Sequence, residues 1–466
     1  MQMGIQIKGL VMDLTQHARL QFLALIWAAL ALPVSRADHY VAQNGQTPAG
    51  LYASWETAAS NIQDAVNVAE AASTVWVGAG RYTVPSNTTN FWGSNVVYIN
   101  RPLSLRSSNG VPETTIIDGQ GKHRGVTWYY GSANTNQFLI DGFSISNCWA
   151  TNRGAGIHFF APNVWTATVQ NCIISDNTAL SENAGLNSAG GGLYIYLTGG
   201  FGLTLSNCVF RNNISTNTAD GTLSQAGGLY IYSYGKKNIS DCTLDSNVSG
   251  RYGGGMYLLS SDVLVENCIF RNNRCELGDN NTSGGAMHLS SGIITLRNCL
   301  IYNNYGSYSG GAIYKFAAVA TPENYGLLTV LNCTIVSNQG SYGSAVYVRR
   351  ADRLSIANSI IYSNLVGVGT VSAYPHYFTN NWINQREITN GVNGEGNITN
   401  GVDPFFQNPV GGDYRLTKDS ACFNAGTNQD WMTGANDLDG RKRIRHGSVD
   451  MGAYELLQEA TVYRFR

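Results

Sequence analysis

Apolar residues alternate with polar residues in short segments that recur along most of the chain. In the segment LTLSNCVF, residues 203–210, Leu203 and Leu205 alternate with polar residues, and Cys208 and Phe210 follow in the opposite phase. A period of two is typical of a β-strand, and the change of phase before Cys208 indicates a corner at which the chain bends. The pattern therefore predicts short strands that meet at a bend.

The residues around this corner recur as nine-residue copies, such as VENCIFRNN at 265–273, with a cysteine or serine five positions before an asparagine. This repeated position holds Cys172, Cys208, Cys242, Cys268, Cys299, Cys333 and Ser359. The position before it holds Asn147, Asn171, Asn207, Asn267, Asn298, Asn332 and Asn358, with Asp241 as the one substitute. Asparagine tolerates left-handed backbone angles and can bond turn amides, so stacked copies are expected to form an asparagine ladder at the bend.

A second repeated segment, which is rich in glycine, lies between copies of the first. Its members are RGAGIHFF at 153–160, AGGGLYIY at 189–196, AGGLYIY at 226–232, YGGGMYLL at 252–259, SGGAMHLS at 283–290, SGGAIYKF at 309–316 and YGSAVYVR at 342–349. Glycine permits a tight turn, and a strand follows it. One glycine strand, one strand before the corner and one after it give three strands per coil. The sequence therefore predicts an all-β fold, a right-handed parallel β-helix whose stacked coils bury columns of aliphatic side chains.

The two ends of the mature chain are expected to cap this solenoid. Apolar residues at helical spacing from Trp55 to Ala69, with Ser54 as N-cap, predict an amphipathic helix over the first coil, and Thr74 to Val77 are expected to begin a strand. The expected divisions are a cap with the first coils at 38–100, repeats at 101–364, and a long loop with a C-terminal capping segment that covers the last coil at 365–466.

Residues 1–37 are interpreted as a signal peptide. An apolar run at 20–32 follows Lys8 and Arg19 and ends before small residues, which predicts cleavage after Ala37. The run is too short to span a membrane, and no later segment is long enough. We therefore expect a secreted or cell-surface protein with no transmembrane segment after cleavage, and a monomer.

Composition narrows the classes of partner and the state of the cysteines. With Lys+Arg 29 against Asp+Glu 30 there is no basic surface to indicate nucleic-acid binding. Nine cysteines in an exported chain would suggest disulfides, but parallel strands about 4.8 Å apart hold equivalent Cβ atoms beyond the distance that a disulfide prefers. The repeated cysteines are therefore expected to be buried free thiols, and the state of Cys148, Cys275 and Cys422 is left open.

The repeats and both ends carry a family resemblance. The alternation of GGAIY-type strands with CxFxxN-type segments over 142–364 resembles the repeats of chlamydial polymorphic outer-membrane proteins and of bacterial right-handed β-helix proteins. Residues 55–84 resemble the N-terminal segment of pectate lyase-like and pectinesterase-like β-helices, and residues 413–455 resemble the tail of secreted proteins with a choice-of-anchor Q domain. The resemblance implies the fold, which hosts many functions.

The glycine strands place one ring-bearing residue per coil at the same position. If Leu193 and Ile195 face the core, the alternate residues face solvent, and the predicted binding residues are His158, Tyr194, Tyr196, Tyr230, Tyr232, Tyr257, Tyr314 and Tyr347. Amphipathic rings with hydroxyl groups suit an extended glycan. The alternative interpretation is that the rings stack on one another and only stabilise the ladder.

Catalysis and metal binding have less support in the sequence. His288, in the same column and next to Lys315 in the following coil, is the candidate general base, and Arg349 is the candidate ligand for a uronate carboxylate. A glycoside hydrolase would need paired carboxylates on adjacent coils, and the central strands carry few acidic residues. The loop 275–285 offers oxygen ligands for Ca2+, without EF-hand spacing, from Glu276, Asp279, Asn280 and Asn281.

Acidic and basic residues cluster in the tail, which has two interpretations. The residues are Asp437, Asp439, Arg441, Arg443, Arg445, His446, Asp450 and Glu455. They could form an acid and base site, but a salt-bridged cap is preferred. Two functions therefore remain: a polysaccharide-binding protein, which as an enzyme would be a polysaccharide lyase or another glycan-active enzyme, or a non-catalytic adhesin or structural spacer.

Overall fold

The computed structural model describes residues 37–85, 89–90, 93–131, 134–162, 164–182, 186–198, 202–218, 223–260, 262–276, 282–316, 326–350, 352–372, 376–383, 392–399, 403–445 and 447–457. The interpretation of residues 1–36 as a signal peptide lies outside these ranges. Within them, no helix combines the length and hydropathy needed to cross a membrane.

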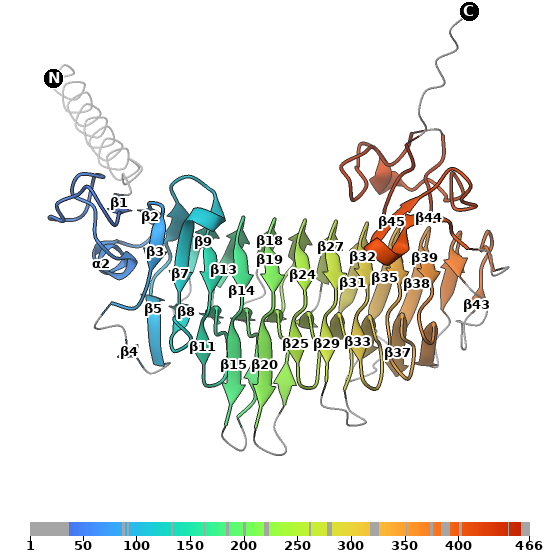
Figure 1. Ribbon diagram of the computed structural model, residues 1–466, viewed down its shortest axis with the longest axis horizontal. Coiled ribbons are helices and arrows are strands. Elements are labelled where there is room, and N and C mark those ends of the chain that lie inside the picture. Colours follow the sequence, from blue (N-terminus) through green and yellow to red (C-terminus); the bar gives the residue numbers. More distant parts are fainter. Residues whose placement is uncertain are drawn as a thin grey trace, which may run out of the picture. The chain divides into compact units, whose positions relative to one another are not determined.

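The chain from Asp38 onward winds into a right-handed parallel β-helix, as predicted, and strands of successive coils lie side by side (Figure 1). Each coil enters sheet I through the glycine strand, then passes through sheets II and III and, in the central coils, a short sheet IV. Sheet I, whose strands are parallel apart from the β4–β5 pair, comprises β4 (Thr89–Asn90), β5 (Gly93–Ile99), β8 (Arg124–Tyr129), β12 (Ile157–Phe160), β17 (Leu193–Leu197), β22 (Leu229–Ser233), β26 (Met256–Ser260), β30 (Met287–Ser290), β34 (Ile313–Phe316), β37 (Val346–Arg350) and β40 (Val368–Ser372).

Sheets II and III are the other two long parallel sheets. Sheet II comprises β1 (Asp38–Val41), β2 (Thr74–Val77), β6 (Ser104–Ser107), β9 (Asn134–Asp141), β13 (Val164–Gln170), β18 (Gly202–Ser206), β23 (Lys237–Ser240), β27 (Asp262–Glu266), β31 (Ile293–Arg297), β35 (Leu327–Leu331), β38 (Arg353–Ala357), β41 (Tyr377–Thr379) and β43 (Val392–Asn393). Sheet III comprises β3 (Gly80–Tyr82), β7 (Thr115–Asp118), β10 (Ser144–Ser146), β14 (Ile173–Ser175), β19 (Val209–Arg211), β24 (Thr243–Asp245), β28 (Ile269–Arg271), β32 (Leu300–Tyr302), β36 (Thr334–Val336), β39 (Ile360–Tyr362) and β42 (Trp382–Ile383).

Shorter pairings complete the coils. Sheet IV comprises β11 (Trp149–Ala150), β15 (Thr178–Ser181), β20 (Ile214–Asn217), β25 (Val248–Ser249), β29 (Arg274–Cys275) and β33 (Tyr305–Gly306). The pair β16 (Ser188–Ala189) and β21 (Ser224–Gln225) is parallel, and the pair β44 (Phe406–Asn408) and β45 (Asp413–Leu416) is antiparallel. The three expected strands per coil are therefore present, and a fourth short one adds to them in the central coils.

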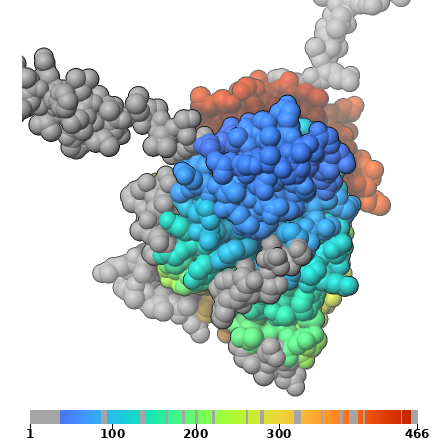
Figure 2. Space-filling view, turned by 90° about the vertical axis from the view of Figure 1, so that its left-hand side faces the viewer, coloured from blue at the N-terminus to red at the C-terminus, as the bar shows by residue number. Residues whose placement is uncertain are grey.

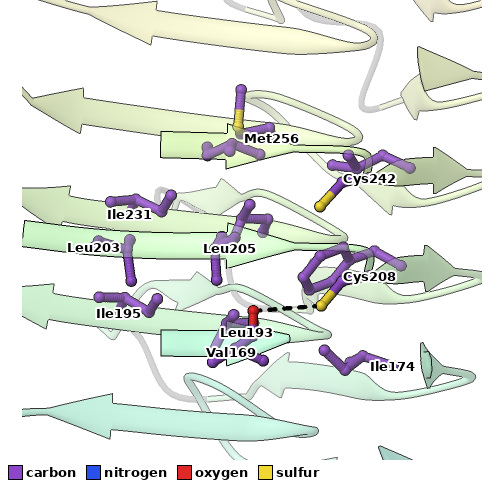
Figure 3. Packing of buried hydrophobic residues seen from close by; sticks show 14 of the residues in the cluster. Val169, Ile174, Leu193, Ile195, Leu203, Leu205, Cys208, Ile231, Cys242 and Met256 are labelled. Atoms are coloured by element: carbon purple, nitrogen blue, oxygen red, sulfur yellow. Dashed lines mark hydrogen bonds between the residues drawn. The ribbon is translucent and has the colours of Figure 1, made fainter. Parts of the chain in front are cut away.

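The core consists of inward-facing columns from sheets I, II and III. Leu193 and Ile195 in β17 pack against Leu203 and Leu205 in β18 and against Cys208 beside β19 (Figure 3). Each of these side chains is at most 1% exposed. Because complete burial of an aliphatic side chain contributes about 1.5–3 kcal/mol, the stacked columns hold successive coils together.

The corner before the cysteine column has the predicted left-handed backbone. The φ angle lies between 50° and 55° at Asn147, Asn171, Asn207, Asp241, Asn267, Asn298, Asn332 and Asn358. Asn147, Asn207 and Asp241 are exposed, whereas Asn298, Asn332 and Asn358 are fully buried. Nδ2 of Asn207 donates to Oδ1 of Asn171 at 2.8 Å.

A second, fully internal asparagine ladder occupies the last position of the nine-residue repeat, which the sequence interpretation did not single out. Nδ2 donates to Oδ1 of the next coil at 2.9–3.0 Å along Asn177, Asn213, Asn247, Asn273, Asn304, Asn338 and Asn364.

All nine cysteines are buried free thiols, as expected for the repeated position. The thiol of Cys208 donates to the carbonyl oxygen of Ser206 at 3.3 Å, and equivalent bonds occur in neighbouring coils. Cys148, Cys275 and Cys422, whose state the sequence left open, are also free in this structure.

A short helix forms the N-terminal cap, but it begins later than predicted. Helix α2 (Ile62–Val68) starts after Asn61, whose side chain accepts a hydrogen bond from the Asp64 amide at 2.9 Å. Ser54 instead bonds Thr57 in a turn, so it is not the N-cap. Ile62, Ala65 and Val66 are buried against the first coils, and the cap lies over that end in Figure 2. β2 (Thr74–Val77) forms where predicted.

The C-terminal prediction needs two corrections. First, residues 365–402 are not simply a long loop, because β40 to β43 extend all three long sheets. The asparagine pattern persists there, since Nδ2 of Asn381 donates to Oδ1 of Asn397 at 3.2 Å.

Second, the described part of the tail, residues 403–445 and 447–457, packs on the outer face of sheet III rather than over the last coil alone (Figure 1). Its apolar residues contact Leu300, Tyr302, Val336, Ile360 and Trp382. Three corner asparagines hold it: Nδ2 of Asn298, Asn332 and Asn358 donates to carbonyl oxygens of Asn436, Asp450 and Thr427.

Candidate functional site

The predicted ring column is in register along sheet I. The aligned residues are His158, Tyr194, Tyr230, Tyr257, His288, Tyr314 and Tyr347. Because successive side chains of a strand point to opposite faces, and Leu193 and Ile195 belong to the core, the column points away from the core. We call this set the inner aromatic column.

The prediction that the inner aromatic column faces solvent is wrong for all its members except Tyr347, which is half-buried. Relative exposures are 1% for His158, 3% for Tyr194, 9% for Tyr230, 8% for Tyr257, 5% for His288 and 6% for Tyr314. The residues just before each glycine turn fold over the column, and they form a ladder of their own through Tyr252, Ser283, Ser309 and Tyr342.

The rings of the inner aromatic column stack on one another. Ring centroids lie 4.9 Å apart for Tyr194 and Tyr230, 5.1 Å for Tyr230 and Tyr257, and 4.7 Å for Tyr257 and His288. Their planes are within 18° of parallel. Each ring face therefore contacts the next ring, and the column offers ring edges and hydroxyl groups to its surroundings.

An outer column, two residues further along each strand of sheet I, is more accessible. In chain order it contains Tyr129, Phe160, Tyr196, Tyr232, Leu259, Ser290, Phe316 and Arg349. Tyr196 and Tyr232, which were predicted as binding residues, are half-buried and stack at 4.8 Å. Arg349 is exposed.

A cleft opens where the residue of the outer column is a serine, which has a small side chain. Its volume is about 450 Å³, and its lining includes Tyr257, His288, Tyr314 and Tyr347 of the inner column and Ser290, Phe316 and Arg349 of the outer column. Tyr252, Ser283, Tyr308 and Ser309 from the preceding turns complete it. The large side chains of Tyr196 and Tyr232 occupy the equivalent place in earlier coils, so Ser290 accounts for the opening beside His288. The structure thus brings five of the predicted site residues together here.

His288 is a neutral residue at the floor of this cleft. Its Nδ1 lies 2.8 Å from Oγ of Ser283. Burial lowers the pKa of His288 to about 3. A base with such a low pKa accepts protons poorly near neutral pH, which disfavours the predicted role in proton abstraction. No finding tests that role directly, so it stays a prediction.

The hydroxyl groups around His288 are also held in place. Burial raises the pKa of Tyr257 to about 12, and a hydrogen bond with Ser290 partly offsets this. A hydrogen bond with the Tyr314 hydroxyl raises the pKa of Arg349, so this guanidinium stays charged at the rim. The cleft therefore combines oriented hydroxyl groups, ring edges and one cation.

The other predicted sites are not part of the cleft. Glu276 pairs with Arg274 at 2.5 Å, and Asp279, Asn280 and Asn281 lie outside the described residues, so the Ca2+ prediction stays untested. Among the residues that the structure describes, no group of three or more His, Cys, Asp or Glu side chains could hold a metal ion.

The acidic and basic residues of the tail form internal ion pairs. Arg443 lies 3.1 Å from Glu455, and Arg441 lies 3.1 Å from Asp439. His446 lies outside the described residues. The preferred interpretation of this cluster as a salt-bridged cap agrees with these pairs.

Sequence reasoning missed the residues that shape the cleft. Tyr252, Ser283 and Ser309 stand at one repeated position just before the glycine turn, and alignment of the repeats could have shown that this position covers the inner column. Ser290 was a second indication of the cleft in the sequence, because it is a small residue at a position of the outer column where neighbouring coils have larger ones.

Comparison with known proteins agrees with the fold. The family described as a right handed beta helix region matches residues 187–338. The solved structure of pectate lyase Pel9A has a TM-score of 0.54 and 16% sequence identity, covering 90% of this chain and 96% of that chain. A search of curated proteins found no match.

Two further solved structures are more distant. A rhamnogalacturonan lyase has a TM-score of 0.36 and 13% identity, covering 79% of this chain and 89% of that chain. The A-module of mannuronan C-5 epimerase AlgE4 from Azotobacter vinelandii has a TM-score of 0.32 and 16% identity, covering 78% and 100%. These two scores are too low to support an argument, and the identity to the pectate lyase is low enough that its likeness shows the fold alone.

Proposed function

We propose that this protein is exported and binds an extended polysaccharide across the outer face of sheet I, with the cleft around His288 as the main point of contact. The observation that carries the proposal is the lining of the cleft: tyrosine and serine hydroxyl groups, ring edges and the exposed guanidinium of Arg349. A sugar presents both apolar CH groups and many hydroxyl groups, which such a lining can contact together.

The charge of Arg349 favours an acidic sugar within this class. A guanidinium forms paired hydrogen bonds with a carboxylate, and such charge-assisted bonds are shorter and stronger than neutral ones. The fold similarity to a pectate lyase agrees with a polysaccharide ligand. We therefore propose uronate polymers as preferred ligands, with weaker binding of neutral glycans.

Affinity electrophoresis on a panel of uronate and neutral polysaccharides tests this proposal. Tyr347→Ala and Arg349→Ala should each reduce retention on uronate polymers at least tenfold, and Arg349→Ala should affect neutral polymers little. The matched controls are Tyr377→Ala in sheet II and Arg211→Ala in sheet III, which replace exposed residues away from the cleft. Equal retention of the cleft variants and the controls would contradict the proposal.

The second candidate function is a structural spacer or adhesin, which the ring stacking favours. Tyr194, Tyr230 and Tyr257 use their ring faces on one another, so these rings already serve the ladder. In that case the wild-type protein would show no retention on any polysaccharide of the panel.

Turnover requires a separate assay. Uronate polymers incubated with the protein would show the absorbance of unsaturated products if a lyase reaction occurs, and His288→Ala would abolish it if His288 is the base. For export, N-terminal sequencing of the protein recovered from the culture medium should begin at Asp38, directly after Ala37.

A further inference from the structure

An ion pair lies inside the solenoid on the core side of sheet I. Lys315 belongs to β34, where its register neighbours are Leu289 and Val348, both core residues. Its Nζ lies 3.3 Å from Oδ1 of Asp352, and both side chains are 0% exposed. A lysine thus replaces an aliphatic residue of a core column, with a carboxylate beside it.

The surrounding backbone fixes these two groups against each other. A Cβ at Gly326 would lie 1.8 Å from Oδ1 of Asp352 and 2.6 Å from Nζ of Lys315, so only glycine leaves room for the pair. Nζ also donates to the carbonyl oxygen of Ser291 at 2.8 Å. The amine is therefore held at one place beside the carboxyl group and away from solvent.

The same burial favours the uncharged forms of both groups. Burial lowers the pKa of Lys315, and the charge of Asp352 only partly offsets this. Transfer of one proton from the ammonium to the carboxylate gives a neutral amine next to a carboxylic acid, the form that a low-dielectric environment prefers. A neutral amine is a nucleophile, and held reactants combine much faster than free ones.

We propose that Lys315 and Asp352 become joined by an intramolecular isopeptide bond after the chain folds. The Nζ lone pair of the neutral amine attacks Cγ of the protonated Asp352 carboxyl group and forms the C–N bond. The C–OH bond then breaks, the hydroxyl leaves with a proton from nitrogen as one water molecule, and the neutral amide remains. No oxidant, reductant or further reactant is required.

Such a bond would connect two successive coils covalently. Lys315 stands in β34 and Asp352 directly precedes β38, so the bond would close the chain between them into a ring. A cross-link of this kind restricts the unfolded chain and slows separation of the coils.

Peptide mapping of the unfolded, trypsin-digested wild-type protein tests the proposal. An amide at Lys315 blocks cleavage after this residue. We expect a branched product in which Asn298–Arg349 is joined to Ala351–Arg353, with a mass about 18 Da, one water, below the sum of the two peptides. Recovery of Asn298–Lys315 in full yield would overturn the proposal and leave a simple buried ion pair.

Lys237 is an internal control. It is also buried, in β23, and its Nζ donates to the carbonyl oxygen of Gly235, but no described carboxylate lies within ion-pair distance. Trypsin should therefore cleave after Lys237 in the same digest. If trypsin cleaves after neither lysine, digestion is incomplete and the missed cleavage at Lys315 is no support for the bond. Detection of the branched peptide therefore decides the test, and its absence from a complete digest contradicts the proposal.

Two variants separate the bond from the ion pair. Lys315→Arg keeps the positive charge but cannot form the amide, so the branched product should disappear and the melting temperature should fall. In Asp352→Asn the amine can displace ammonia, so a branched peptide should form with a mass about 17 Da below the sum. A branched product that persists in Lys315→Arg would assign the cross-link to other residues and contradict the proposal.

Discussion

Tyr230 and Tyr257, from successive coils, stack face to face with ring centroids 5.1 Å apart and planes 3° from parallel. They belong to a small cluster outside the main core that also contains Tyr194, Ala189 and Ala226. The outward side of sheet I therefore has its own packed layer, and removing one ring leaves a gap between two others.

We expect Tyr230→Ala to destabilise the protein by about 3 kcal/mol, the cost of deleting a buried aromatic side chain. Tyr230→Phe keeps the ring between Tyr194 and Tyr257 and should cost less than about 1 kcal/mol. Urea denaturation followed by circular dichroism measures both values. Equal stability of the wild type and Tyr230→Ala would mean that the stack does not contribute to folding.

The buried asparagine ladder supports a second prediction. Oδ1 of Asn247 accepts hydrogen bonds from both the backbone amide and Nδ2 of Asn213, at 3.1 and 3.0 Å. Asn247→Ala leaves the buried backbone amide of Asn213 without a partner, and Nδ2 of Asn213 keeps only its bond to the carbonyl oxygen of Ile174. At about 1–3 kcal/mol for each lost bond, we expect a loss of about 3 kcal/mol. The exposed Asn238 in the same coil is the control, and Asn238→Ala should change the urea midpoint little.

The sequence predicted the stacking of coils because stacking depends on repeated positions. The adjacent pair of Asn207 and Cys208 recurs in successive coils although the number of residues between copies varies, and a side chain that repeats at one position of a parallel coil must lie over its counterpart. The left-handed corner followed from the same repetition, since asparagine adopts that backbone more readily than most residues. The fold and the register of the inner column could thus be predicted.

The burial of the column could not be predicted from alternation, which tells only which face of the strand a residue occupies. Whether Tyr194 meets solvent depends on the turn that precedes its strand, and the position before each glycine turn was not considered in that prediction. The packing of the tail against sheet III could not be predicted from the sequence for a similar reason. It depends on an apolar patch formed by Leu300, Tyr302 and Ile360 across several coils, which no single segment contains.

A third prediction concerns the thiols. All nine thiols are at most 2% exposed, so a reagent cannot reach them in the folded protein. Burial also raises the pKa of Cys268 and Cys333, whereas hydrogen bonds with neighbouring thiols lower the pKa of Cys242, so exclusion of the reagent depends on burial rather than on ionisation. A thiol reagent such as DTNB should therefore label no cysteine of the folded protein and all nine after unfolding without reductant. Ser341→Cys, at an exposed position, should react at once and shows that the reagent is active. Fewer than nine reactive thiols after unfolding would indicate disulfides.

The last prediction is a pH dependence of the tail. Arg443 is buried with three carboxyl groups, those of Asp437, Asp450 and Glu455, so the cluster carries more potential negative than positive charge. Burial raises the pKa of Glu455 from 4.5 to about 8, against the attraction of Arg443, and it also raises the pKa of Asp437.

The folded tail therefore binds a proton more tightly than the unfolded tail does. This stabilisation is complete below about pH 4.5, declines as pH rises and is lost once pH exceeds about 8. Hydrogen exchange in residues 422–455, corrected for the intrinsic rate, should show protection that falls by up to about tenfold per pH unit across this window. Glu455→Gln keeps a neutral side chain of the same shape, so its protection should vary far less with pH. An identical pH profile in the wild type and in Glu455→Gln would show that another group controls the docking of the tail.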